Sequence, residues 1–268
     1  MQPISILGPG AADLAATLAD RLTGRVAVVR RIEGAADSGG EPAAVGDTTV
    51  DISPDGSWVG RGAASDVDAL LDRFAPDHDY VVVVGYSRLR LPTVLVGSDA
   101  DPADTPGDVV TRAPTPADVD VAELLTALDG AEPWVTREEL VARVERSAAA
   151  DRSGAIATFT GRVRARDDPD DDRTTHLAFE KYEGVARDRM DAIAAELTDR
   201  EGVFEVAMHH RTGVVEAGED IVFVVVLAGH RAEAFRAVED GIDRLKDEVP
   251  IFKKETTETE AFWLHQRE

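Results

Sequence analysis

The chain has 268 residues, enough for two ordinary domains with separate cores, and 52 acidic against 29 basic residues give it a formal net charge of −23. That charge repels nucleic acid and anionic membranes, and it suits a halophilic cytoplasm, where salt screens the self-repulsion. The first residues, MQPISILGPG, lack the pattern of a signal peptide. The absence of cysteine excludes disulfides, cysteine nucleophiles and cysteine-ligated metal centres, and no apolar run approaches the length that spans a bilayer, so we expect a cytoplasmic protein.

Residues 3–97 predict a small parallel α/β layer, because strands and helices alternate along them. We expect helices at 11–22 and 67–74 and strands at 4–7, 25–32, 80–85 and 93–96, with short strands in TTVDIS and SWVG. The loop GPGAAD opens the first helix, where such folds hold phosphates. It lacks the Lys-Ser/Thr pair of a P-loop, and Asp13 would repel an anion. We therefore expect no nucleotide site.

This segment resembles the MobB-type adaptor protein of molybdopterin-guanine dinucleotide synthesis in its strand–loop–helix start, its second strand RVAVVRRI and the sequence VVVVGYSRLRLPTVLVG. Members of that family carry an intact P-loop, so the resemblance implies a degenerate, P-loop-like α/β domain at 1–97 and leaves a scaffolding or docking role open. Residues 97–118 are rich in Pro, Asp and Thr, which predicts a linker. With a short helix at 119–128, we expect the linker to cover 98–135 and a second domain to cover 136–268.

The second domain begins with a capping box, Thr136 to Glu139, that opens a helix ending near residue 146. We expect strands at 155–164, 176–182 and 203–210, a helix at 184–200, a hairpin over 214–226 and a helix at 232–249. IVFVVVL, at 221–227, is apolar on both faces and predicts a central strand. The acidic run RDDPDDDR predicts a solvated loop rather than a cation site. His209 and His210 are expected on opposite strand faces, as structural or supporting groups rather than as zinc ligands.

Two groups of basic residues could bind an anion such as a phosphate or carboxylate. Arg162 and Arg164 share a strand face with two threonines, which predicts either an anion surface or a solvated face. His230 and Arg231 begin the helix at 232–249, where free N–H groups and the helix dipole favour a phosphate or carboxylate.

Lysine is scarce and clustered. The chain has four lysines, and three of them, Lys246, Lys253 and Lys254, lie within nine residues. Lys246 is predicted on or beside the apolar stripe of its helix, which is formed by Phe235, Val238, Ile242, Leu245 and Val249. Lysine can lose its proton when it is desolvated, whereas arginine in practice cannot, so the cluster indicates a nucleophile or base. The alternative is a helix end whose dipole attracts cations.

Six motifs in register over 136–268 resemble the catalytic (large) subunit of molybdopterin synthase, the MoaE family. They are TFTGRVR (158–164), FEKYEG (179–184), HHRTG (209–213), AGEDIVFV (217–224), GHRAEAF (229–235) and DRLKDEVPIFKKE (243–255). The resemblance implies an α+β fold, an antiparallel sheet with packed helices. It implies that cyclic pyranopterin monophosphate is converted to molybdopterin. The sulfur would come from the C-terminal thiocarboxylate of a ubiquitin-like small subunit, a MoaD-type carrier, with no metal or other cofactor.

By motif position, Lys246 and Lys253 match the catalytic lysines of that family. The segments that contact its substrate are matched by Arg162, Val163, Arg164, His230, Arg231, Lys246, Lys253, Lys254 and Glu255. Phe252 stands where the family often has Trp, and Arg162 stands where it usually has Lys.

The implied roles follow the chemistry of each group. Arg164, His230 and Arg231 would hold the phosphate. A partly desolvated Lys246 would approach the thiocarboxylate carbonyl or transfer protons, and Lys253 would assist ring opening and sulfur addition. Which lysine is the nucleophile stays open. The family works as a homodimer with one carrier bound at each end, so we expect a heterotetramer whose site is completed by the second protomer. The alternative is a non-catalytic scaffold for pterin intermediates and partners, which would not need both lysines.

Overall fold

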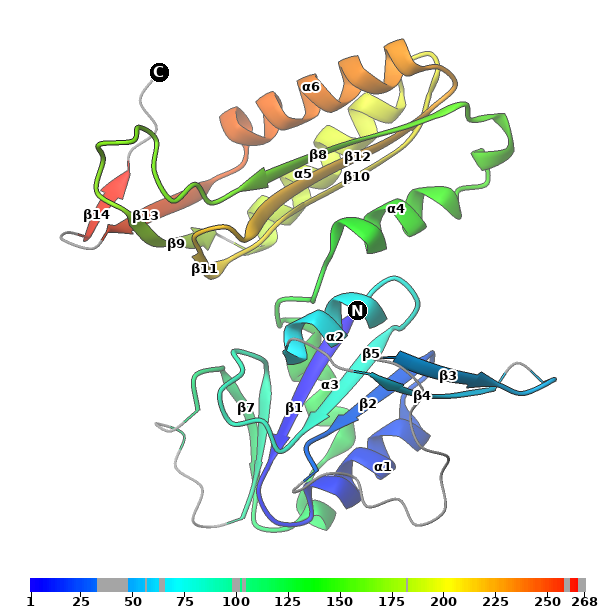
Figure 1. Ribbon diagram of the computed structural model, residues 1–268, viewed down its shortest axis with the longest axis vertical. Helices are drawn as coiled ribbons and strands as arrows, with labels where there is room; N and C mark the ends of the chain where they lie inside the picture. Colours follow the sequence, from blue (N-terminus) through cyan, green and yellow to red (C-terminus); the bar gives the residue numbers. More distant parts are fainter. Residues whose placement is uncertain are drawn as a thin grey trace. The chain divides into compact units, whose positions relative to one another are not determined.

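The computed structural model describes residues 1–32, 48–55, 57–62, 66–97, 102, 105–181, 183–257 and 261–264. It divides into two compact units, Met1–Trp134 and Val135–Glu268 (Figure 1). No helix in the described part of the chain is long and apolar enough to cross a membrane.

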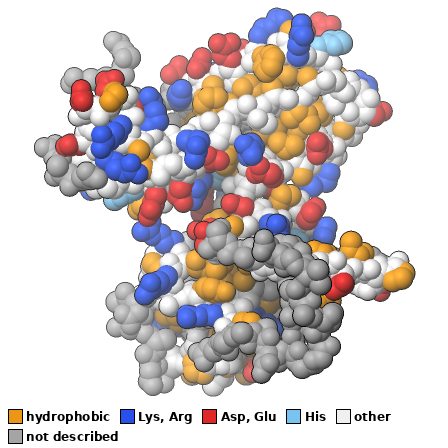
Figure 2. Space-filling view, in the orientation of Figure 1, with side chains coloured by type: hydrophobic (Ala, Val, Ile, Leu, Met, Phe, Trp, Pro, Cys, Tyr) orange, Lys and Arg blue, Asp and Glu red, His pale blue; other side chains and the backbone are white. Residues whose placement is uncertain are grey.

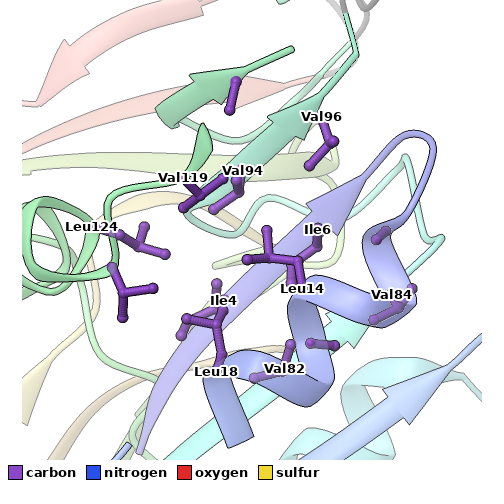
Figure 3. Packing of buried hydrophobic residues seen from close by; sticks show 14 of the residues in the cluster. Ile4, Ile6, Leu14, Leu18, Val82, Val84, Val94, Val96, Val119 and Leu124 are labelled. Carbon is purple, nitrogen blue, oxygen red and sulfur yellow. The ribbon is translucent and has the colours of Figure 1, made fainter. Parts of the chain in front are cut away.

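The first unit contains a parallel sheet with helices, as predicted, and these helices cover both faces of the sheet. Its strands pair in the order β2-β5-β1-β6-β7, and they are β1 (Gln2–Leu7), β2 (Val26–Arg30), β5 (Tyr80–Val84), β6 (Thr93–Val96) and β7 (Val109–Ala113). Helices α1 (Ala11–Arg21) and α3 (Val121–Asp129) pack on one face, and α2 (Val67–Phe74) packs on the other. Figure 3 shows the first of these cores, where Leu14 and Leu18 of α1 meet Ile4 and Ile6 of β1. Strands β3 (Thr48–Ile52) and β4 (Trp58–Gly62) pair with each other in an antiparallel register.

Much of the predicted linker belongs to this unit. β7 extends the sheet beside β6, and α3 contributes Leu124 and Leu128 to the core. Trp134 closes the unit, because its N–H donates to the carbonyl of Met1 at 2.8 Å and its indole donates to Asp72 at 2.9 Å. The boundary therefore falls between Trp134 and Val135 rather than at residue 97, and the expected start of the second domain at 136 lies one residue from it.

The second unit is α+β with antiparallel sheets, as the resemblance implied. One sheet has the order β10-β12-β8, from β8 (Ala155–Arg162), β10 (Val203–His210) and β12 (Asp220–Ala228). The other has the order β11-β9-β13-β14, from β9 (Thr174–Lys181), β11 (Gly213–Glu216), β13 (Ile251–Thr257) and β14 (Ala261–Leu264).

Helices cover both faces of the first of these sheets. The side chains of α5 (Glu183–Thr198) and α6 (Arg231–Glu248) form a core with Val222, Val224 and Val226. The alternate residues Phe223, Val225 and Leu227 form a core with α4 (Arg137–Glu145). The prediction of a central strand at 221–227 is confirmed, and its unbroken apolar sequence follows from burial on both faces.

Two local predictions are corrected. The hairpin expected over 214–226 does not form, because β11 pairs with β9 whereas β12 pairs with β10 and β8, so the turn between them joins two sheets. The stripe of α6 does not include Phe235, which is 65% exposed. Its buried face uses small residues, Ala234, Ala237 and Gly241, which allow the helix to lie close to β12. A Cβ on Gly241 would lie 3.0 Å from the side chain of Val224.

Candidate functional site

The two predicted catalytic lysines flank one tight turn. Lys246 lies in the last turn of α6, and Lys253 is the third residue of β13. Between these elements the N–H of Ile251 donates to the carbonyl of Val249 at 2.9 Å, which closes a three-residue turn centred on Pro250. Proline suits the central position because its φ is held near −65° and it has no N–H to satisfy. The helix therefore passes directly into the strand.

Lys246 is exposed in the single chain. The residues that face the core around it are Ile242, Leu245 and Val249, each at most 6% exposed. The expectation of a partly desolvated amine is therefore not met within one chain, and the apolar stripe ends beside Lys246 rather than including it.

Lys253 and Lys254 leave β13 on opposite faces, because side chains alternate along a strand. Lys253 lies opposite Phe179 of β9 and shares a face with Ile251, which packs into the small core of Val163, Leu177, Phe179 and Val215. Lys254 shares the other face with Phe252, which is 49% exposed. Both lysines are half-buried.

Glu255 lies on the same face as Lys253 and accepts a hydrogen bond from the hydroxyl of Thr174. That bond ties β13 to β9 near the end of their ladder. The carboxylate predicted to contact substrate thus has a structural contact in this chain.

The predicted anion-binding arginines already pair with acidic groups. Arg162 ends β8, with its Nε 3.0 Å from Asp220 and a further bond to the carbonyl of Gly218. Arg164 lies beyond the strand, with its Nη1 3.0 Å from Asp167. Three of the four side chains are well exposed, and that of Asp220 is 39% exposed. Exposed pairs of this kind contribute about 0–1 kcal/mol each, so a phosphate can exchange for the carboxylate at little loss.

Val163, between these arginines, is 2% exposed and belongs to the small core beneath β13. Its side chain therefore cannot touch a ligand, and its N–H donates to the carbonyl of Glu219 at 2.9 Å. Val163 still affects the geometry of the site, because it shares this core with Ile251 and so holds Arg162 and Arg164 near the start of β13.

His230 and Arg231 lie at the opposite end of α6 from the lysines. His230 is the N-cap, with φ −139° and ψ 161°, and its side chain makes no capping bond. Both side chains are exposed. Fifteen helical steps separate Arg231 from Lys246, which is about 22 Å at 1.5 Å per residue. One chain therefore does not bring these cations together with its own lysines.

His210 is buried beneath the face of β13 that carries Lys253. The sequence predicts this histidine as a structural or supporting group. His210 is 6% exposed, and its ring lies edge to face with the ring of Phe179, the cross-strand neighbour of Lys253, with 4.9 Å between the ring centroids. Its Nδ1 donates to the carbonyl of Arg211 at 2.7 Å. Arg211 in turn donates to the carbonyl of Asp220 at 3.0 Å. Within the described residues, no three His, Asp or Glu groups lie together as metal ligands.

Comparison with known proteins agrees with the resemblance to the MoaE family. A family model described as MoaE protein matches residues 134–248. The probable molybdopterin synthase of Haloferax volcanii is 53% identical over 272 residues and matches along the full length of both chains. The molybdopterin synthase catalytic subunit of Pyrococcus abyssi is 36% identical over 127 residues, which cover 47% of this chain and 82% of that one.

Among solved structures, a MobB protein homologue from Bacillus stearothermophilus matches with a TM-score of 0.33 and 19% identity, over 47% of this chain and 96% of that one. The match at full length to the Haloferax volcanii protein decides the assignment, since it includes both units. The chain belongs to the MoaE family, the enzymes that are the catalytic subunits of molybdopterin synthase.

Proposed function

We propose that this chain converts cyclic pyranopterin monophosphate to molybdopterin at the turn between α6 and β13. The observation that supports this best is the placement of Lys246 and Lys253 on either side of that turn, with Arg162 and Arg164 held nearby through the shared core of Val163 and Ile251. Two amines that can exchange protons and two guanidiniums that can hold a phosphate are the groups that this reaction needs.

The sulfur is delivered by a ubiquitin-like carrier as its C-terminal thiocarboxylate. The sulfur bonds to a carbon of the pterin side chain, and water then cleaves the resulting thioester, which releases the carrier as a carboxylate and leaves the sulfur on the pterin. Two such transfers install the dithiolene. A lysine ammonium donates a proton to the oxygen that leaves when the ring opens, and a neutral lysine amine removes a proton from the attacking group.

A second copy of the chain completes the site. His230 and Arg231 lie about 22 Å from Lys246 along the same helix, so these two phosphate contacts come from a different chain than the lysines, whereas Arg162 and Arg164 come from the same chain as the lysines. The second copy also supplies the desolvation of Lys246 that a single chain lacks. Two chains and two carriers make a heterotetramer with two composite sites.

The test of catalysis uses the purified chain at high salt, with a thiocarboxylated carrier and the cyclic pterin, followed by oxidation to the fluorescent molybdopterin derivative. Lys246→Ala and Lys253→Ala are each expected to lower the rate by about 10²–10⁴-fold, the usual contribution of a general acid or base. Arg236→Ala removes another exposed cation of α6, one that donates to the carbonyl of Ala232 in its own helix at 3.2 Å, and should leave the rate unchanged. No product from the unaltered chain, beside an active control enzyme, would favour the scaffold instead.

Lys254→Ala reports which face of β13 binds the ligand. A loss of rate much smaller than that of Lys253→Ala would indicate that the ligand binds on the face of β13 that carries Ile251. A comparable loss of rate would indicate a further contact on the face that carries Phe252.

Co-expression of two inactive chains tests the composite site. In a mixed dimer of Lys246→Ala and Arg231→Ala chains, one site carries both substitutions and the other carries neither. Random pairing therefore restores about a quarter of the wild-type activity. If each site lies within one chain, the mixture stays as inactive as either variant alone.

We further propose that the first unit binds no nucleotide phosphate. A Cβ on Gly10 would lie 2.5 Å from the ring of Pro116, so that proline covers the start of α1. The loop has no lysine, and Asp13 lies in the first turn of the helix. Equilibrium dialysis with GTP and Mg²⁺ is expected to show no binding, and saturable binding would contradict the proposal.

A further inference from the structure

The turn that joins β11 to β12 is fixed against the end of β8. It comprises residues 216–220, and Gly218 at its centre has a φ of 96°, a value that favours glycine. The N–H of Val163 donates to the carbonyl of Glu219 at 2.9 Å, and the N–H of Gly218 donates to the carbonyl of Val163 at 2.8 Å. These two main-chain bonds hold the turn beside residues 162–164.

The side chain of Asp220 lies against Arg162 across this contact. The two residues are cross-strand partners in the ladder of β12 and β8. One edge of the Arg162 guanidinium is occupied, because its Nε lies 3.0 Å from the Asp220 carboxylate and its Nη2 donates to the carbonyl of Gly218. A guanidinium carries five N–H groups in a planar fork, so its outer edge, formed by Nη1 and Nη2, still has two donors. That edge matches two oxygens of a phosphate, which can bind there without displacing the carboxylate.

The main chain and the side chain of Asp220 have different contacts. The Asp220 carbonyl accepts a hydrogen bond from Arg211 at 3.0 Å, and the same Arg211 atom lies 3.8 Å from the carboxylate of Glu219. These contacts hold the turn without the Asp220 carboxylate, whose ion-pair partner in the described part of the chain is Arg162. A substitution of the Asp220 side chain therefore tests the orientation of Arg162 and keeps the bonds that hold the turn.

Arg164 is held in a different way. Its Nη1 lies 3.0 Å from Asp167, three residues along the same loop, and the two side chains are 77% and 74% exposed. A carboxylate beside a bound phosphate repels it, so on charge alone the loss of either Asp167 or Asp220 would tighten phosphate binding. Orientation of Arg162 by Asp220 predicts the opposite result for Asp220.

We propose that Asp220 is a positioning residue, which holds the guanidinium of Arg162 so that its outer edge binds the phosphate of the substrate. A side chain that is already held in one rotamer loses less conformational entropy when the ligand binds. Figure 2 shows Lys and Arg side chains gathered over the part of the second unit where β9, β13 and β14 lie, although the chain has a net charge of −23. The inference rests on the proposed function, because the bound phosphate is taken from it.

The test measures binding without sulfur transfer. The full-length protein is dialysed to equilibrium against cyclic pyranopterin monophosphate at one fixed high salt concentration, with no carrier present. We expect Asp220→Ala to raise the Kd by about 3–10-fold, because Arg162 must then be ordered by the ligand. Asp220→Asn keeps an oxygen that can accept from the Nε–H group of Arg162, and its Kd should lie close to that of the unaltered chain. Asp167→Ala is the matched control and should leave the Kd unchanged or lower it.

Two variants of Arg162 separate positioning from a merely structural role. Arg162→Lys keeps the charge but has no planar fork, so its Kd should rise about as much as that of Asp220→Ala. Arg162→Met keeps the aliphatic stem, and adding Asp220→Ala to it should change the Kd no further, since Asp220 then has nothing to position. An unchanged or lowered Kd for Asp220→Ala, or effects of Asp220→Ala and Arg162→Met that simply add, would overturn the proposal.

Addition of the carrier separates this inference from the proposed function. The expected pattern of Kd values without any product would support the positioning role and refute sulfur transfer. Product formed by a chain whose Kd does not respond to Asp220→Ala would refute the positioning role alone. Absence of binding by the unaltered chain would overturn both.

Discussion

The last turn of α6 is held to α5 by a carboxylate shared between two arginines, and its removal has a calculable effect. Glu248 accepts hydrogen bonds from Arg244 at 2.8 and 3.3 Å and also from Arg189 of α5. These side chains are 27%, 22% and 38% exposed, so the network lies between a surface pair and a buried one. We expect Glu248→Gln to lower the free energy of unfolding by about 2 kcal/mol, although Arg244 keeps its second ion pair, with Glu196 of α5 at 2.6 Å.

Calorimetry on the full chain measures this loss of stability. The measurement is made in about 2 M salt, where exposed ion pairs are screened and partly buried pairs are screened much less. A loss of that size lowers the melting temperature of the second unit by about 8 °C. Arg189→Met keeps most of the aliphatic stem, and the double variant with Glu248→Gln should lose about 0.5–1 kcal/mol less than the sum of the single losses. A loss below about 0.5 kcal/mol for Glu248→Gln, or strict additivity, would refute the assignment of a shared, partly buried network.

Three further outcomes follow from local geometry and charge. Gly154→Ala is expected to lower the free energy of unfolding in urea by about 1–3 kcal/mol, because its Cβ would lie 2.6 Å from the carbonyl oxygen of Gly229. Gly184→Ala has no heavy atom within 4 Å of its Cβ and should raise the free energy of unfolding by up to about 1 kcal/mol. Equal effects of the two substitutions would contradict this reasoning. His210→Phe keeps the ring but leaves the carbonyl of Arg211 without its donor, which should lower the unfolding free energy by about 1–3 kcal/mol. Stability should rise with salt as the net charge of −23 is screened, and a flat or falling curve would count against a halophilic protein.

The sequence predicted elements well where burial leaves a regular pattern. The run at 221–227 is apolar at every position because β12 is covered by helices on both faces, so its central place could be read directly. The helix at 231–248 was found within one residue at each end, since Gly229 precedes it and Pro250 follows it.

Prediction failed where distant pairing decides the structure. β13 reads IFKKETT, a polar sequence that becomes a strand because β9, about seventy residues earlier, supplies its ladder. The Pro and Asp residues around β7 predict a linker, although β6 gives this strand a partner. The helical spacing of apolar residues predicts Phe235 in the buried stripe, whereas close packing against β12 selects small residues such as Gly241.

The candidate site shows the same division between local and distant information. Clustering of lysine identified the segment at 246–254, and the turn at Pro250 explains why Lys246 and Lys253 belong together. The separation of His230 and Arg231 from those lysines also follows from the sequence, because the predicted helix at 232–249 begins at the first pair and ends just after Lys246. The length of α6 then carries the argument for two chains. A helix of 18 residues, with the proposed phosphate contacts at its start and Lys246 near its end, cannot fold back on itself, so the proposed twofold pair is the simplest arrangement that brings the start of one helix to the end of the other.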